Sequence, residues 1–115
     1  MKDAATQVRA LITGALAGMV NLPGSYQKAA GCGADWDPAC PATGMTLGDD
    51  GKYTLTVAIP AGEYEYKVAL DGAWTVNFGS DGAQDGPNYT LSLAADSTVT
   101  FTYDPNTHLV EVTTQ

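Results

Sequence analysis

The chain has 115 residues, which suits one small domain with its own hydrophobic core. Thirteen acidic side chains against five basic ones give a net charge of −8. This charge repels phosphate backbones and anionic lipid surfaces, so we expect neither nucleic acid nor a membrane as a partner. Thirteen glycines and six prolines divide the chain into short segments, which favours strands over long helices.

Residues 1–17 are interpreted as an N-terminal extension or an extra strand ahead of the domain at 18–115. Gln7–Ala17 is compatible with an edge strand or with a short helix rich in Ala and Leu, and we favour an extended conformation. The apolar run 10–20 is too short to span a membrane. Basic residues upstream of this run also allow a signal peptide, although the run leads straight into the domain.

The domain contains seven or eight short segments with strand character, at spacings of roughly ten residues. Tyr53, Leu55, Val57 and Ile59 alternate with polar residues, as on a strand with one buried face. Pro60-Ala61-Gly62 follows, and predicts a hairpin between this strand and the next. The spacing predicts an all-β, antiparallel β-sandwich. The expected strands span 18–22, 44–48, 52–59, 63–70, 88–93, 97–103 and 108–113.

The segment 63–70 is the most regular of these strands. Its residues Tyr64, Tyr66, Val68 and Leu70 share one face, and Glu63, Glu65, Lys67 and Ala69 share the other. Asp71-Gly72 then indicates a tight turn, and Trp74 follows it. We expect the first face to enter the core and Lys67 to lie with Trp74 on the solvent side.

The segment 25–43 has no periodicity and contains both cysteines of the chain, Cys32 and Cys40. Long loops in small domains are usually functional or cross-linked. A disulfide closing this short loop is favoured, with free thiols as the alternative. Two cysteines with no second pair and one distant histidine are a weak argument for a zinc site. A disulfide indicates an oxidising, extracellular setting.

Catalytic motifs find little support in this sequence, and we expect no enzyme activity and no cofactor. His108 lies beside a Pro-Asn turn, which suits a surface or strand-end position. Asp35 and Asp37 are neighbours in one loop, whereas a glycosidase pair flanks a cleft from opposite sides. Asp49-Asp50-Gly51 indicates a turn, because a calcium site needs more spaced oxygen ligands.

Trp36 and Trp74 fall outside the alternating pattern of core aromatics. Two such indoles can form a flat apolar platform, which suits the C–H face of a pyranose ring. Lys67 would supply hydrogen-bond donors beside them, and Asn77 or Asn88 both donor and acceptor. Alternatively, each tryptophan closes one end of the sandwich as a hydrophobic plug.

Three stretches in order carry a family resemblance: GSYQ through GC at 24–32, DWDPAC at 35–40, and PAGEYEYKVALDGAW at 60–74. Together they resemble the X25-type modules of bacterial pullulanases and amylopullulanases over residues 18–113. They are also similar to the starch-binding domains of outer-surface SusE/SusF-type proteins. The resemblance implies an Ig-like sandwich with an accessory role. The chain departs from that pattern at 75–79, in the loop after Trp74.

The strand, turn and tryptophan are also similar to the wider glycogen-binding family, which includes the β-subunit domain of AMP-activated kinase. Carried over by position, that resemblance implies an α-glucan site formed by Trp36, Lys67, Trp74 and Asn88. It predicts a non-catalytic module that binds starch, maltooligosaccharide or pullulan-like chains. Its partners would be the tethered catalytic or surface domains of a secreted or cell-surface protein. The alternatives are a structural spacer packed on a neighbouring domain, and a carrier that uses only the stable sandwich.

Overall fold

The computed structural model describes residues 18–115, so the predicted extension or strand at 1–17 lies outside the described residues. The described part is all-β and antiparallel, as predicted, with no helix long and apolar enough to cross a membrane. One short 3-10 turn, η1 (Pro41–Thr43), accompanies nine strands. These are β1 (Val20–Asn21), β2 (Thr46–Leu47), β3 (Tyr53–Ile59), β4 (Gly62–Tyr66), β5 (Val68–Leu70), β6 (Asn77–Phe78), β7 (Tyr89–Leu93), β8 (Ser97–Asp104) and β9 (Leu109–Thr114).

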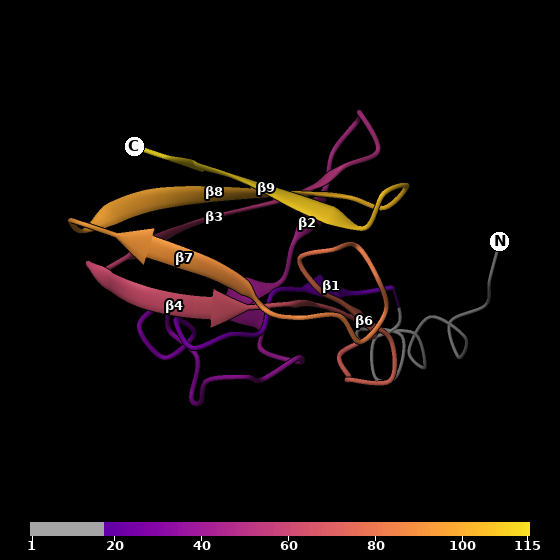
Figure 1. Cartoon of the computed structure of the whole chain (residues 1–115), viewed down its shortest axis with the longest axis horizontal. Coiled ribbons are helices and arrows are strands. Elements are labelled where there is room, and N and C mark those ends of the chain that lie inside the picture. Colours follow the sequence, from indigo (N-terminus) through magenta and orange to yellow (C-terminus); the bar gives the residue numbers. More distant parts are fainter. Residues whose placement is uncertain (1–17) are drawn as a thin grey trace, which may run out of the picture.

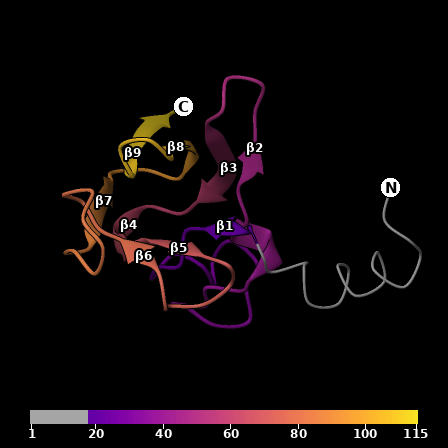
Figure 2. The same ribbon diagram turned by 90° about the vertical axis from the view of Figure 1, so that its right-hand side faces the viewer.

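The strands form two layers that face each other across the core (Figure 1). One layer is a four-stranded sheet in the order β2-β3-β8-β9. The other combines the pair β4-β7 with the three-stranded sheet β1-β5-β6. The two layers are also seen as separate in Figure 2, which is turned by 90°. In both views the loop between β1 and β2 runs along the outer side of the second layer.

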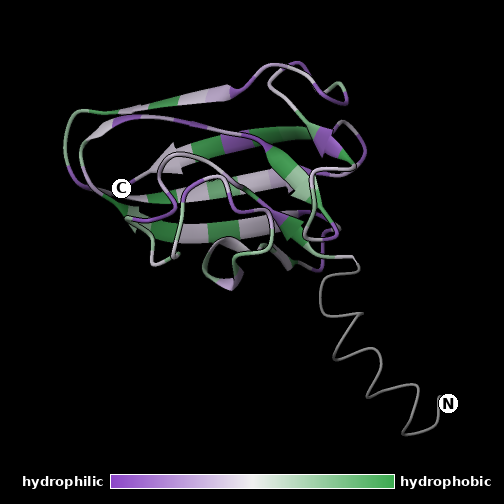
Figure 3. Ribbon diagram, turned by 90° about the horizontal axis from the view of Figure 1, so that it is seen from below, coloured by the Kyte–Doolittle hydropathy of each residue, from purple (hydrophilic) through white to green (hydrophobic). Residues whose placement is uncertain are grey.

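Alternation along the strands builds the core, and it is visible as bands of hydropathy in Figure 3. In β8, Val99, Phe101 and Tyr103 are buried while their neighbours are at least partly exposed. Leu91 and Leu93 of β7 face them from the second layer. Each such side chain contributes about 1.5–3 kcal/mol through burial.

The predicted hairpin between the segments 52–59 and 63–70 is wrong. Strand β3 pairs with β2 and β8, and β4 pairs with β7. The chain therefore crosses from one layer to the other at Pro60–Ala61. A proline-glycine turn reverses the chain in either arrangement, so the local pattern does not distinguish a hairpin from a crossover between layers.

The predicted strand 63–70 is continuous in direction but broken at Lys67 into β4 and β5. The Lys67 amide donates to the carbonyl of Pro23, 3.0 Å away. Beyond it the alternation fails, because Val68 and Ala69 are both fully buried. The expectation that Ala69 lies on a wet face is wrong, since the loop between β1 and β2 covers the outer side of this layer.

Candidate functional site

The loop that carries Trp36 is cross-linked by a disulfide between Cys32 and Cys40, as the sequence favoured. Trp36 has a φ of 58°, in the left-handed region that bulky residues rarely adopt. Its amide donates to the carbonyl of Gly24, 3.2 Å away. The indole is therefore presented by a closed loop in an uncommon backbone conformation.

The first turn of this loop is anchored in the core by Tyr26. Its side chain is fully buried, with its ring 5.8 Å from that of Phe101 in β8. Its hydroxyl donates to the carbonyl of Leu22 at 2.6 Å. Burial raises the pKa of Tyr26 far above its usual value, because the apolar surroundings disfavour the phenolate. The tyrosine therefore stays neutral and fixes the loop against the sandwich.

Trp74 stands on the second loop, between β5 and β6. Asp71 and Gly72 have φ values of 60° and 70°, the signature of a type I′ turn. The Ala73 amide closes this turn on the carbonyl of Leu70 at 3.3 Å. The predicted Asp-Gly turn is thus present, and it delivers Trp74 to the surface.

The two loops bring Trp36 and Trp74 together. Their ring centroids lie 6.3 Å apart and their planes are inclined by 39°. Trp74 is 38% exposed and Trp36 is half-buried. The pair therefore forms a bent apolar surface that solvent reaches mainly on the Trp74 side.

The polar residues expected beside the indoles, Lys67, Asn77 and Asn88, differ in burial and lie on different elements. Lys67 is half-buried at the junction of β4 and β5. Asn88 is exposed ahead of β7, and its Nδ2 donates to Glu65 Oε1 at 3.3 Å. Asn77 is 95% buried and its amide donates to Trp74 O and Asp85 Oδ1, so both of its donors are already used within the protein.

Two buried amides beside the tryptophans have a role that the sequence did not indicate: Gln27 was not singled out, and Asn77 was expected only as a possible sugar contact. Gln27 is fully buried and bonds both backbone groups of Asp37, the residue after Trp36. Asn77 bonds the carbonyl of Trp74. Neither follows a periodic pattern. One signal could have found them: each is an uncharged polar side chain in or next to a loop that carries a tryptophan.

The carboxylates of the first loop act as local backbone acceptors. Asp35 Oδ1 accepts from the Lys28 amide, and Asp37 Oδ1 from the Ala39 amide, at 2.8 and 2.9 Å. Within residues 18–115, three or more potential metal-ligating side chains do not gather anywhere. These contacts give both aspartates a structural use in ordering the loop.

His108 also has a structural place. Its ring stacks on Phe78, with the centroids 3.8 Å apart and the planes at 4°. Its Nδ1 lies 2.9 Å from the hydroxyl of Tyr103. The half-buried imidazole therefore joins the tip of the β8–β9 hairpin to the second layer.

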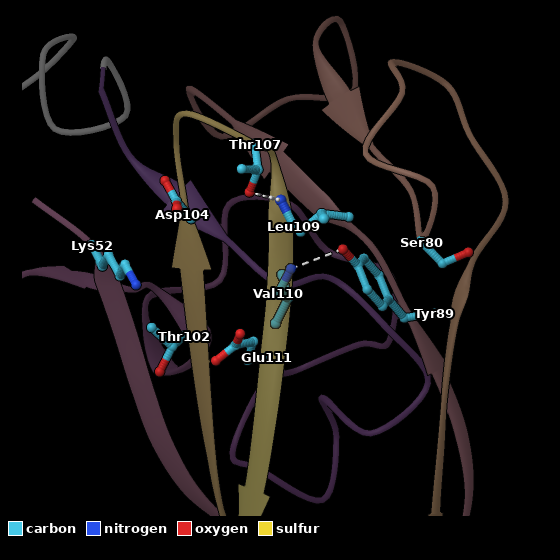
Figure 4. Close-up of a pocket in the computed structure, with 9 residues that line it drawn as sticks. All are labelled: Lys52, Ser80, Tyr89, Thr102, Asp104, Thr107, Leu109, Val110 and Glu111. Carbon is cyan, nitrogen blue, oxygen red and sulfur yellow. Dashed lines mark hydrogen bonds between the residues drawn. The ribbon is translucent and has the colours of Figure 1, made fainter.

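A cavity of about 340 Å³ opens elsewhere, between β7 and β9 (Figure 4). The hydroxyl of Tyr89 points to the backbone of β9 and accepts from the Val110 amide at 2.9 Å. Lys52, Asp104 and Glu111 bring charges of both signs to its wall. Neither tryptophan lines this cavity, so the aromatic pair is a separate surface.

A two-layered antiparallel sandwich with a cross-linked loop and a surface pair of tryptophans defines the class: a small all-β module. Comparison with known proteins then places it. Residues 19–110 match the model of the family described as the pullulanase X25 domain, and the chain belongs to that family.

The relatives are large proteins in which this module is a small part. The chain is 47% identical over 89 residues to an amylopullulanase of Thermoanaerobacterium saccharolyticum, covering 76% of the chain and 7% of that protein. It is 41% identical over 88 residues to an amylopullulanase of Thermoanaerobacterium thermosulfurigenes, covering 76% and 5%. The solved structure of a pullulanase from Bacillus acidopullulyticus superposes with a TM-score of 0.73 at 32% identity, covering 83% of this chain and 11% of that one.

Proposed function

We propose that this X25 module is a non-catalytic accessory domain that binds α-glucan on the Trp36–Trp74 pair. The observation that carries the proposal is the meeting of the two indoles, 6.3 Å apart, on two separately ordered loops. Pyranose rings stack their C–H faces on aromatic planes, so neighbouring indoles can contact neighbouring sugars. The incline of 39° between the planes suits a chain that curves from one sugar to the next.

The names of the relatives support starch-type chains as the ligand. Amylopullulanase and pullulanase are named for α-linked glucans, and the matched segment is a small part of each. We propose that this chain likewise serves a larger starch-active protein. A weak site on a tethered module raises the local concentration of a catalytic domain on insoluble substrate. The disulfide supports an extracellular or cell-surface location.

Lys67 and Asn88 complete the proposed site. Lys67 has a flexible stem and three donors for sugar hydroxyls. Asn88 is exposed and held by Glu65, which leaves its carbonyl oxygen available as an acceptor. We expect Lys67→Ala and Asn88→Ala to weaken binding by less than either tryptophan change, because the stacking area is the larger contribution.

The test is retardation of the wild-type module in a gel that contains amylopectin, with fluorescence titration by maltoheptaose. We expect retardation and a change in indole emission. Trp74→Ala should abolish both while the protein stays folded, because Trp74 is 38% exposed and lies outside the core. Leu47→Ala, which removes an exposed side chain from β2 in the opposite layer, is the matched control and should bind normally.

A second candidate function uses the same aromatic pair as an anchor on a neighbouring domain. Trp36 is half-buried against Trp74, as expected for a packing anchor as well. In that case the isolated module shows neither retardation nor an emission change with maltoheptaose. A Trp74→Ala variant that loses stability but not affinity for the sugar would instead indicate that Trp74 is a hydrophobic plug of the sandwich.

A further inference from the structure

The backbone at Trp36 needs an external restraint. Its φ of 58° lies in the left-handed region, where a bulky side chain is strained unless the surroundings fix it. The disulfide closes the loop at Cys32 and Cys40, each four residues from Trp36, and so does not by itself set the direction of the indole. Hydrogen bonds close to Trp36 have to do so.

Gln27 supplies these hydrogen bonds from inside the protein. Its Oε1 accepts from the amides of Asp37 and Gly24, at 2.8 and 3.1 Å. Its Nε2 donates to Asp37 O at 2.8 Å and to Thr43 Oγ1 at 2.9 Å. Every donor and two acceptor positions of this fully buried amide are therefore used.

The arrangement brackets Trp36 on both sides. The following residue, Asp37, is bonded to Gln27 through both its amide and its carbonyl. The Trp36 amide itself donates to Gly24, whose own amide is bonded to Gln27. A change of φ at Trp36 would break this set of bonds, so the amide of Gln27 selects the conformation that presents the indole.

Asn77 plays the corresponding part for Trp74. It is 95% buried in β6, and its Nδ2 donates to Trp74 O at 3.0 Å and to Asp85 Oδ1 at 2.9 Å. Both partners of Nδ2 are acceptors, which fixes the orientation of the amide. The loop after the type I′ turn is thereby tied to the sheet at the residue that carries the indole.

We infer that Gln27 and Asn77 are positioning residues that hold the Trp36–Trp74 pair in its binding geometry. This inference rests on the proposed function for its consequence in affinity. Neither side chain contacts the sugar, because both are buried beneath the loops. Each acts through the backbone of one tryptophan loop, so that the two indoles meet before a ligand arrives. Preorganised groups bind more tightly because less conformational entropy is lost on binding.

Size-preserving substitutions test this inference. Gln27→Glu replaces two donors by a carboxylate oxygen that faces the carbonyl of Asp37, and Asn77→Asp does the same against Trp74 O and Asp85. We expect each to lower amylopectin affinity by about tenfold, the equivalent of one lost hydrogen bond. With their rings 6.3 Å apart, the two indoles should give an exciton couplet in the far-ultraviolet circular dichroism of the free protein. We expect each substitution to remove this couplet.

Two further variants separate positioning from stability. Val99→Ala makes a cavity in β8, remote from both loops, and should lower stability while preserving the couplet and the affinity of the folded fraction. Asp85→Gly removes the exposed carboxylate that orients Asn77, at a residue with a φ of 59°, which glycine tolerates. This variant keeps the fold and should weaken the couplet, so it decides the role of Asn77 if Asn77→Asp does not fold.

The inference is overturned if the folded Gln27, Asn77 and Asp85 variants keep the couplet and bind as the wild type does. It is equally overturned if the loss of affinity in these variants is explained by their unfolded fraction alone. That is the result expected for Val99→Ala. The couplet is measured without sugar. If the wild-type module fails to bind amylopectin, the proposed function fails, and the couplet still tests the positioning of the indoles.

Discussion

Gly24 lies where the loop between β1 and β2 passes closest to β4. It forms a bridge with Tyr66, and the next amide, that of Ser25, donates to Glu65 O at 2.9 Å. A Cβ at position 24 would lie 2.4 Å from Glu65 O and 2.7 Å from Tyr66 Cβ. Since both atoms belong to a paired strand, the space cannot open without moving β4. The glycine is required by this approach and not by an unusual φ.

Gly24→Ala should therefore destabilise the module. We expect a loss of about 1–3 kcal/mol in the free energy of unfolding, as for overpacking in a rigid site. The matched control is Gly33→Ala in the same loop, where an added Cβ meets nothing within 4 Å. Urea unfolding of both variants measures the difference. Equal midpoints for the two would contradict the close approach at Gly24.

At the residue scale, the residue pattern could single out the tryptophans, whereas only the family resemblance implied that they lie in one site. Trp36 and Trp74 stood out because neither fits the alternation of the core. Their meeting depends on the position of one loop over a strand that is distant in the chain, and no local pattern encodes that. The same limit applies to Gln27 and Asn77, since a buried amide and an exposed one look alike until the partners of each are known.

At the scale of elements, the Cys32–Cys40 disulfide is the covalent closure of the loop that carries Trp36. Replacing both cysteines by serine should lower the free energy of unfolding by about 2–3 kcal/mol, because the unfolded loop regains its entropy. Guanidinium unfolding with and without dithiothreitol measures this loss. The wild type should weaken on reduction, and the double variant should be insensitive to the reductant. An unchanged midpoint of the reduced wild type would contradict the prediction.

Strand existence was predicted well and strand pairing poorly. Tyr53–Ile59 and Ser97–Asp104 alternate cleanly, and both are strands in the structure. The predicted hairpin failed because a strand shows which of its faces is buried, but not which strand lies beside it. The break at Lys67 was missed for a related reason. Its cause is the carbonyl of Pro23, which belongs to a segment without any periodic signal.

At the scale of the whole molecule, tyrosines join the two layers. Tyr66 of β4 stacks on Tyr89 of β7, with centroids 4.9 Å apart, and its ring meets the ring of Phe101 from the opposite layer at 5.0 Å. Tyr103 of β8 is 98% buried on the facing sheet. Three of the buried core side chains, Tyr26, Tyr66 and Tyr103, thus carry an ionisable hydroxyl. The stability of the core depends on these hydroxyls remaining neutral.

Burial raises the pKa of four tyrosine hydroxyls, that of Tyr103 to about 12. In the unfolded chain a tyrosine ionises near pH 10, so above that pH the unfolded state holds fewer protons than the folded state. The contribution of these groups to the free energy of unfolding is therefore fully present below about pH 10. It is lost as the pH rises through the pKa values of the folded state. The four residues are Tyr26, Tyr66, Tyr89 and Tyr103.

The expected outcome is cooperative alkaline unfolding. Urea unfolding at a series of pH values should give a free energy that declines above about pH 10, with tyrosinate absorbance appearing together with the loss of structure. Tyr103→Phe keeps the buried ring but loses the hydroxyl that contacts His108 Nδ1. This variant should be less stable at neutral pH and should decline less steeply above pH 10. If the free energy of unfolding declined with pH as steeply in Tyr103→Phe as in the wild type, Tyr103 would not contribute to the alkaline transition.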